Sequence, residues 1–308
     1  MRTREPKNLA ASVRQKLFGL ARARNEDFGL MLVKYGLERI LYRLSRSKHR
    51  DAFILKGALL FELWTHRTYR ATRDADFLAR GDNDPERFVS IFKELCVIDV
   101  EPDGLTFDAG SVKAERITED ADYEGVRVTF TAYLERARIP IQIDIGFGDV
   151  ITPAPIETAY PTLLPAPNPR LLTYPKETVV AEKFEAMVKL GIANSRMKDF
   201  YDVDALSRTL DFDGKTLREA IGKTFERRGN QLPSSGTPVA FTPEFYDDAN
   251  KKKQWTAFCT RNATYVKKIE LKEVIENIQL FLAPVVAALL NDNSFAKRWD
   301  PGGPWQWK

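Results

Sequence analysis

The sequence contains few of the residues from which disulfide frameworks and zinc centres are built. In 308 residues there are two cysteines, Cys96 and Cys259, and two histidines, His49 and His66. The cysteines lie far apart and neither belongs to a CxxC pair, so a disulfide-stabilised fold and a zinc site are both unexpected. The composition therefore fits a reducing compartment.

Long hydrophobic runs are also missing. The most apolar stretch, Ile275 to Leu290, is interrupted by Asn277, Gln279 and Pro284. It is shorter than the about 20 apolar residues that a membrane-spanning helix needs, so we expect a buried helix that kinks or ends near Pro284. The segment MRTREPKNLAASVRQ lacks the apolar core of a signal peptide. We therefore expect a cytoplasmic protein with no membrane partner.

A strong excess of charge of one sign is absent as well. The chain has 47 Lys and Arg against 43 Asp and Glu, a net charge of +4. This modest basic excess permits a nucleic-acid partner without requiring one. The hydrophobic fraction of 44% and charged fraction of 29% are those of an ordinary globular protein, long enough for about two domains.

The first half of the chain mixes helical and strand patterns. Apolar residues recur at helical spacing across residues 8–47, and residues 52–63 predict a short strand that passes into a helix at Gly57. A strand is expected at 73–78 and a helix from Asp84 to Cys96, with Pro85 in its first turn.

The segment 104–149 has the only sustained alternation of apolar and polar residues. Val126, Val128 and Phe130 alternate with polar residues, and so do the apolar residues at 139, 141, 143, 145 and 147. This pattern predicts two strands joined around residues 135–138 in an antiparallel pair.

Proline marks a boundary after this pair. Residues 151–175 hold seven prolines, which predicts a linker without a continuous strand or helix. Beyond it we expect helices only, at 176–191, 197–210, 214–228, 243–259 and 270–291, and an irregular tail. The predicted fold is α+β: a mixed β-sheet domain with helices at 1–150, the linker at 151–175 and a helical domain at 176–308.

Carboxylates gather on the polar faces of the predicted strands. Asp74 and Asp76 are two residues apart, so both leave the same face, and Asp144 lies on the polar face of another strand. Converging carboxylates repel each other unless a cation lies between them, and oxygen ligands of this kind suit Mg²⁺. The alternative, which is the commoner meaning of an isolated Asp-x-Asp, is a solvated pair at a strand end.

Two further segments are suggestive on physical grounds. In Leu55-Lys56-Gly57-Ala58 a glycine follows a strand, and the amides of such a turn can approach a triphosphate. Lys183 projects from an apolar helix stripe, so either it has a partner, which is a carboxylate such as Asp199 or a phosphate, or it snorkels to the surface. On the apolar-stripe interpretation, Lys183→Met should be at least as stable as the wild type.

Four segments, in this order, resemble the motifs of the AbiEii/AbiGii-type toxin family within the DNA polymerase β-like nucleotidyltransferases. They are Leu55 to Phe77 with its Asp-x-Asp, Gln142 to Asp149, Ala181 to Ala186, and Arg196 to Asp202. Four ordered matches are more specific than any one of them. The pair Gly57-Ala58 departs from the Gly-Gly or Gly-Ser of many members.

The resemblance implies a nucleotidyltransferase fold and Mg²⁺-dependent transfer of a nucleoside monophosphate from an NTP to an acceptor. Characterised relatives include toxins that modify the 3′ end of tRNA and are paired with an antitoxin. Two alternatives stay open. One is a transferase acting on a protein or small molecule, and the other is a non-catalytic nucleotide-binding module.

The resemblance also implies roles for individual residues. The metal ligands are Asp74, Asp76 and Asp144, and the catalytic residues are Asp74, Asp76, Lys183 and Asp199. The nucleotide-binding residues are Lys56, Gly57, Ala58, Arg73 and Lys183, and Thr72 is a regulatory position that a partner phosphorylates in some relatives. Asp149 is expected to cap the exit loop of the sheet. Basic residues that could form an RNA-binding face are Lys189, Arg196, Lys198, Arg170, Arg227, Arg228, Lys251, Lys252 and Lys253.

Overall fold

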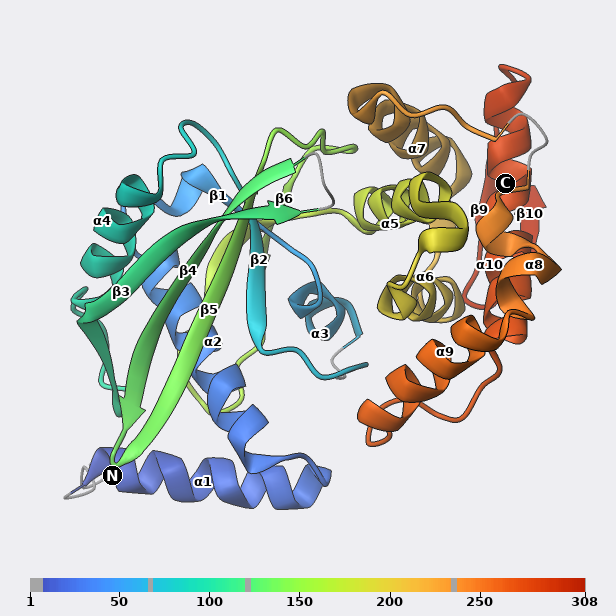
Figure 1. The fold of residues 1–308 in the computed structure, drawn as a ribbon. Helices are drawn as coiled ribbons and strands as arrows, with labels where there is room; N and C mark the ends of the chain where they lie inside the picture. The colour runs from blue at the N-terminus through green and yellow to red at the C-terminus, as the bar shows by residue number, and fades with distance from the viewer. Residues whose placement is uncertain (1–7, 66–68, 120–122, 234–236, 308) are drawn as a thin grey trace. The chain divides into compact units, whose positions relative to one another are not determined.

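The computed structural model describes residues 8–65, 69–119, 123–233 and 237–307, and the chain divides into two compact units (Figure 1). Unit 1 comprises Met1–Gly148 and Ile156–Thr173, and unit 2 comprises Asp149–Pro155 and Tyr174–Lys308. The chain therefore leaves unit 1 once, returns to complete its sheet, and leaves again.

Unit 1 begins with two helices, α1 (Leu9–Arg24) and α2 (Phe28–Ser45), in the segment predicted to be helical. Their starts are capped by Asn8 and Asp27, whose side chains accept hydrogen bonds from backbone amides three residues later. Asn25 ends α1 with a positive φ of 53°, so the predicted helical segment is broken into two helices.

The centre of unit 1 is a seven-stranded mixed sheet in the order β3-β4-β5-β2-β1-β7-β6. Its strands are β1 (Phe53–Lys56), β2 (Asp74–Ala79), β3 (Leu105–Glu119), β4 (Tyr123–Leu134), β5 (Ala137–Phe147), β6 (Ile156–Ala159) and β7 (Arg170–Thr173). The pairs β2–β5 and β1–β7 are parallel, and the other pairs are antiparallel. The remaining helices are η1 (Arg50–Ala52), α3 (Leu59–Thr65) and α4 (Pro85–Cys96).

One face of this sheet is apolar and covered, and the other carries polar side chains. Figure 1 shows α2 passing behind β4 and β5, and α4 packs against β3. The covered face carries the buried alternating residues predicted from the sequence, Val126, Val128 and Phe130 among them. Their polar neighbours therefore point away from the core, which places Asp144 and its partners on the opposite face.

The segment predicted as a linker contains two strands of the sheet. Strands β6 and β7 lie within residues 151–175 and add to the edge beside β1. Each is a four-residue stretch without proline, Ile-Glu-Thr-Ala or Arg-Leu-Leu-Thr, flanked by the prolines. The expectation of a strand-free segment was wrong because proline excludes only its own position from a ladder, not the residues between prolines.

Unit 2 is mainly helical. Its helices are α5 (Lys176–Leu190), η2 (Gly191–Ala193), α6 (Met197–Thr209), α7 (Gly214–Arg228), η3 (Val239–Phe241), α8 (Pro243–Tyr246), α9 (Ala249–Arg261) and α10 (Leu271–Leu290). A small sheet in the order β10-β9-β8 joins β8 (Phe212–Asp213), β9 (Lys297–Trp299) and β10 (Trp305–Trp307).

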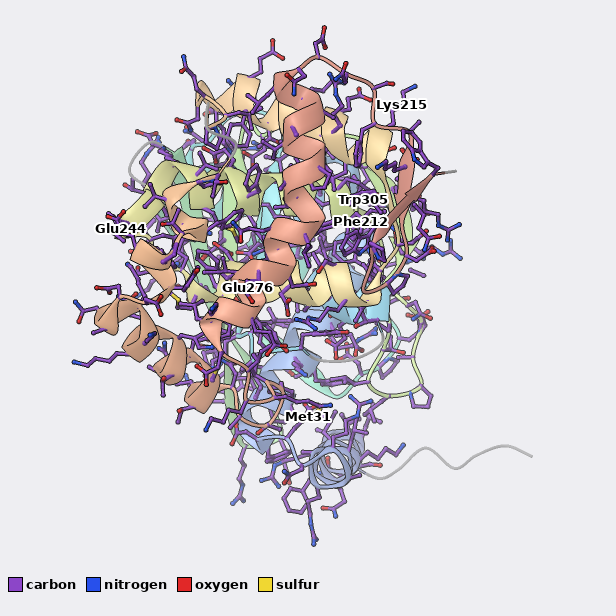
Figure 2. The ribbon with its side chains drawn as sticks, turned by 90° about the vertical axis from the view of Figure 1, so that its right-hand side faces the viewer. Met31, Phe212, Lys215, Glu244, Glu276 and Trp305 are labelled. Carbon is purple, nitrogen blue, oxygen red and sulfur yellow. The ribbon has the colours of Figure 1, made fainter. Side chains whose placement is uncertain are left out.

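This small sheet corrects the expectation of helices only and of an irregular tail. Trp299 is 2% exposed and donates a hydrogen bond through Nε1 to the carbonyl of Ser207 at 2.6 Å. Trp305 stacks on Phe281, and Phe212 packs against the same ring. In Figure 2, Phe212 and Trp305 lie next to each other beside α10. Tryptophan burial thus fixes a tail whose local sequence predicts no regular element.

Helix α10 (Leu271–Leu290) continues through Pro284, so the helix expected at 270–291 is confirmed and, of the two alternatives of a kink or an end near this proline, the end is excluded. By length and composition alone it is apolar enough to cross a membrane, with a mean hydropathy of 1.6, which is weak evidence. Its side chains at 274, 275, 278, 281, 282 and 285 are fully buried, and Asn277 donates to Asp204 of α6 at 2.7 Å. The helix therefore has the contacts of a core helix of unit 2.

Candidate active site

Three carboxylates meet on the polar face of the sheet in unit 1. Strands β2 and β5 are parallel, with Asp76 opposite Asp144 and Asp74 opposite Gln142. Oxygen atoms of Asp74, Asp76 and Asp144 all lie within 4.8 Å of one another. The predicted convergence of the three side chains is confirmed, and their role as metal ligands stays a prediction.

The geometry of this cluster fits a small divalent cation. Oxygen ligands of Mg²⁺ lie about 2.0–2.1 Å from the ion, so two of them are at most about 4.2 Å apart. The limit of 4.8 Å between the aspartate oxygens is only slightly larger, so rotations of the side chains would close the difference. Asp74 and Asp76 are half-buried and Asp144 is buried, which leaves two of the three carboxylates in reach of solvent.

Arg127 on β4 is a member of this cluster that was not predicted. It stands opposite Asp144 in the β4–β5 register, with Nε 2.8 Å from Oδ1 and Nη2 2.7 Å from Oδ2. This bidentate hydrogen bond raises the pKa of Arg127, and Gln142 donates to the same carboxylate at 3.2 Å. Alternation with Val126 and Val128 could have shown which face Arg127 occupies, but not that it meets Asp144.

Gly57 lies directly against Asp76. Its φ is +76°, and a Cβ atom at this position would collide with the Asp76 carboxylate. The position therefore requires glycine for two reasons, its backbone conformation and the closeness of Asp76. Lys56 is paired with Asp76 in the β1–β2 register. The turn predicted to bind nucleotide is thus brought to the carboxylates.

Thr72 and Ala58 are close to the same turn. Strand β2 begins at Asp74, so Thr72 precedes it, yet its Oγ1 donates to Asp74 Oδ1 at 2.6 Å. Thr72 and Ala58 also line one small cavity. Arg73, the remaining predicted nucleotide contact of unit 1, is exposed and lines a groove over β3–β5 together with Gln142.

Unit 2 holds a second charged centre, on α5 and α6. Lys183 Nζ lies 2.6 Å from Asp199 Oδ1 and 2.9 Å from Asp202 Oδ2, and Arg196 Nε lies 2.6 Å from Asp199 Oδ2. The side chains of Asp199 and Asp202 are 0% and 1% exposed, and that of Lys183 is 13% exposed. The predicted pairing of Lys183 with Asp199 is confirmed.

This arrangement lowers the pKa of Asp199. Burial by itself would raise that pKa, but the opposite charges of Lys183 and Arg196 outweigh it. Lys183 is therefore not an isolated charge in an apolar stripe, which was the premise for expecting Lys183→Met to be as stable as the wild type. Since two buried carboxylates depend on this lysine, we now expect the opposite.

Several basic residues considered for an RNA-binding face have internal partners. Arg228 is mostly buried, with Nη1 2.5 Å from Glu185 Oε2 and Nη2 3.4 Å from Asp149 Oδ1. Asp149 lies two residues after the end of β5, where the chain leaves the sheet, and is grouped with unit 2. It accepts a hydrogen bond from Tyr174 at 3.3 Å. These side chains form a buried network that stabilises unit 2.

The other basic candidates differ in exposure. Lys251 is buried and donates to the carbonyl of Asn194 at 2.8 Å, so it is not part of an exposed face. Arg196 donates a hydrogen bond to Asp199, whereas Lys189 and Lys198 are exposed on α5 and α6. A role of these exposed lysines in RNA binding stays a prediction.

Sequence comparison assigns the family. The profile of the nucleotidyl transferase AbiEii toxins of type IV toxin–antitoxin systems matches residues 39–277. This match spans both charged centres. No curated protein is significantly similar to the chain in sequence.

Two crystal structures from Helicobacter pylori are similar to this one at low sequence identity. JHP933 is 13% identical, with a TM-score of 0.48 over 85% of this chain and 94% of its own. A candidate nucleotidyltransferase is 13% identical, with a TM-score of 0.47 over 86% of this chain and 98% of its own. These values are too low to carry an argument, whereas the profile match covers most of the sequence. By that match, the chain belongs to the AbiEii family of nucleotidyltransferase toxins.

Proposed function

We propose that this protein transfers a nucleoside monophosphate from an NTP to the 3′ end of tRNA in a Mg²⁺-dependent reaction that releases pyrophosphate. The observation that carries this proposal is the convergence of three carboxylates within 4.8 Å on one sheet face. A glycine turn in direct contact with one of them adds backbone amides beside the cluster. Carboxylates and amides together are the groups that a metal-bound triphosphate needs.

Asp74, Asp76 and Asp144 would hold the metal ion. A bound Mg²⁺ supplies charge neutralisation for the transferring phosphoryl group and helps to align the attacking hydroxyl. The donor set consists of carboxylate oxygens only, which is the ligand chemistry that Mg²⁺ prefers. The three carboxylates carry like charge within 4.8 Å of one another, so binding a cation relieves repulsion among them.

The neighbouring residues keep these ligands in position. Arg127 holds both oxygens of Asp144, which fixes the orientation of the most buried ligand. Thr72 donates to Asp74 Oδ1 and leaves Oδ2 of that carboxylate outside this hydrogen bond. Gly57 leaves space for Asp76, so the nucleotide-binding turn and the ligand can be neighbours. Lys56, Ala58 and Arg73 are the other proposed nucleotide contacts in unit 1.

In unit 2 we propose that Lys183 is a nucleotide contact and that Asp199 positions it. Two buried carboxylates hold the amine of Lys183 in one place. A lysine restrained in this way loses little side-chain entropy when it binds phosphate.

The acceptor is tested by following the label from each of four α-³²P-labelled NTPs. The purified protein is incubated with total tRNA, with a protein extract, or with a metabolite pool, each with Mg²⁺ or with EDTA. We expect label in tRNA only with Mg²⁺, and none after periodate oxidation of the 3′ terminal ribose. Label in protein or in metabolites would identify that pool, and not tRNA, as the source of the acceptor. Absence of label from every pool would favour a non-catalytic nucleotide-binding module.

Regulation is proposed at Thr72. Membership of a toxin–antitoxin family implies an antitoxin partner, and the hydroxyl of Thr72 already contacts Asp74. A phosphate on this hydroxyl would add roughly −1.5 to −2 charge beside the carboxylates. It would repel the NTP or take up the metal ion, and either effect silences transfer. With tRNA as acceptor and a partner in the same compartment, the site of action is the cytoplasm.

A further inference from the structure

A groove of about 700 Å³ lies along strands β3, β4 and β5. Its lining residues are Val33, Arg73, Asp108, Gly110, Ser111, Lys113, Thr129, Phe130, Thr131, Arg138, Pro140, Ile141 and Gln142. The groove begins at the carboxylate cluster, because Gln142 lines it and also donates to Asp144. All of it belongs to unit 1.

Local irregularities of the sheet create the groove. The β3–β4 register shifts between Asp108 and Lys113, and Ser111 in this bulge accepts a hydrogen bond from the Thr131 amide and donates one to the Asp108 carbonyl. On the other side, β2 pairs with β5 only from Gln142 onward, so the part of β5 around Pro140 has no neighbour from β2. The groove is therefore built into the fold by a bulge and a short strand.

Three basic side chains in this groove carry no internal partner. Arg73, Lys113 and Arg138 are exposed, and within the described residues none of them forms an ion pair or hydrogen bond. Other arginines of the same strands are paired: Arg116 lies 3.0 Å from Glu124, and Arg127 binds Asp144.

The one acidic residue in the lining does not offset this charge. The carboxylate of Asp108 accepts a hydrogen bond from the amide of Gly110, two residues later in the bulge, and it forms no ion pair within the described part of the chain. The groove therefore has a positive excess that is left for a ligand.

We propose that this groove binds the phosphate backbone of the single-stranded 3′ end of the acceptor RNA and directs its terminal hydroxyl to the carboxylates. The inference rests on the proposed function and adds the place of the acceptor. Arg138 is four residues from Gln142 along β5, which is about 13 Å. Stacked nucleotides advance about 3.4 Å each along a strand. A cation at this distance from Gln142 therefore lies several nucleotides along an RNA chain that ends at the carboxylates.

Other occupants explain the groove less well. The phosphates of an NTP are compact and belong at the metal ligands, whereas Lys113 and Arg138 extend the positive charge away from them. A small neutral acceptor would gain nothing from three cations. A polyanion that continues from the reaction centre uses the metal ligands at one end and the basic residues along its length.

The test is binding of a fluorescently labelled single-stranded RNA of about 12 nucleotides to the full chain without NTP, measured by anisotropy at several KCl concentrations. The variant Lys113→Ala/Arg138→Ala is compared with the control Lys93→Ala/Arg136→Ala, which removes the same two kinds of charge from exposed positions outside the groove. Since each phosphate contact on single strands contributes about 0.7 to the salt slope, the groove variant should lose about 1.4 from it. Its affinity near 0.1 M salt should fall about tenfold or more, with the control within about threefold of wild type.

The outcomes separate this inference from the proposed function. If both double variants weaken RNA binding equally, or if the wild type binds no RNA, the proposal that the groove binds RNA would be overturned. So would a matching loss of labelled-NTP binding by the groove variant, because the groove would then belong to the nucleotide. If tRNA is labelled but the groove variant binds RNA normally, only the groove fails. If RNA binds in the groove but never accepts label, the proposed acceptor fails and the groove stands.

Discussion

The two charged centres of this protein differ in burial and in the cations that lie beside their carboxylates. In unit 1, Asp74, Asp76 and Asp144 gather on the polar face of the central strands β2 and β5, and Arg127 forms an ion pair with Asp144. In unit 2, Asp199 and Asp202 are almost fully buried and are matched by Lys183 and Arg196. The first centre groups three carboxylates in an arrangement that suits an external cation. In the second centre, cations of the protein itself neutralise the two aspartates.

This difference predicts which substitutions change activity and which change stability. A cluster of like charges costs folding free energy, so removing the half-buried Asp74 or Asp76 should harm the fold little. A matched buried group contributes differently, because removal of one partner leaves an uncompensated charge. The same kind of substitution should therefore affect activity in unit 1 and stability in unit 2.

The largest effect is expected for Asp76→Ala. Loss of a metal ligand should lower the transfer rate by about 10²–10³-fold or more, because charge stabilisation in the transition state is lost. The melting temperature should stay the same or rise, since repulsion with Asp74 and Asp144 is relieved. The measurements are NMP transfer and thermal unfolding, with Asp82→Ala at an exposed loop as the control. Unchanged transfer by Asp76→Ala would remove the metal-site hypothesis.

Lys183→Met should behave in the reverse way, with a loss of folding free energy of about 3–5 kcal/mol. The physical reason is that Asp199 and Asp202 would stay buried with Arg196 as their remaining cation from this centre. The triple variant Lys183→Met/Asp199→Asn/Asp202→Asn should recover most of this stability but not transfer activity. Urea unfolding and the transfer assay measure the two effects. A single variant as stable as the wild type would show that Lys183 is not needed to neutralise the buried pair.

Another buried carboxylate, Glu38 in α2, extends the comparison to the pH dependence of stability. Burial raises the pKa of Glu38 to about 7, despite a hydrogen bond from the Leu163 amide and the nearby Arg39. A raised folded-state pKa means that the folded protein binds more protons than the unfolded chain between about pH 4.5 and 7. The contribution of Glu38 to stability is thus complete below this window and is lost as pH rises through it, by about 3 kcal/mol at most.

Asp199 has the opposite dependence, because its pKa is lowered and its contribution is lost as pH falls below the ordinary range of aspartate. We therefore expect Glu38→Gln to flatten the fall in unfolding free energy between about pH 4.5 and 7 while leaving the acid limb unchanged. Urea denaturation across this range measures both limbs. An unchanged slope in Glu38→Gln would mean that other groups set the pH dependence.

The smallest effect is expected for Thr72→Val. Removing the hydrogen bond to Asp74 should position this carboxylate less well and raise the activation free energy of transfer by about 1–2 kcal/mol. The transfer rate should then fall roughly five- to thirtyfold, with the fold intact. Thr72→Glu is a partial mimic of phosphorylation and should lose NTP binding through charge repulsion. Equilibrium binding of a labelled NTP distinguishes the two variants. Full binding by Thr72→Glu would remove the case for a switch at this position.

Much of the site followed from local patterns. The spacing of Asp74 and Asp76 determines that both leave one face of a strand, and alternation in β5 puts Asp144 on its polar face. Gly57 was recognisable as a turn glycine, although not as the residue that makes room for Asp76. These inferences held because a strand's period of two is a property of the backbone, independent of what packs on it.

The sequence by itself thus determined the positions and kinds of most helices and strands, and the faces on which the carboxylates lie. Only the tertiary structure decided that Arg127 meets Asp144, that Arg228 is buried against Glu185, and that two proline-free stretches complete the sheet edge. Local periodicity is encoded within a few residues, so one segment of sequence can reveal it. Strand register and buried charge pairs join residues 17 to 43 positions apart or more, and they depend on packing that no single segment contains.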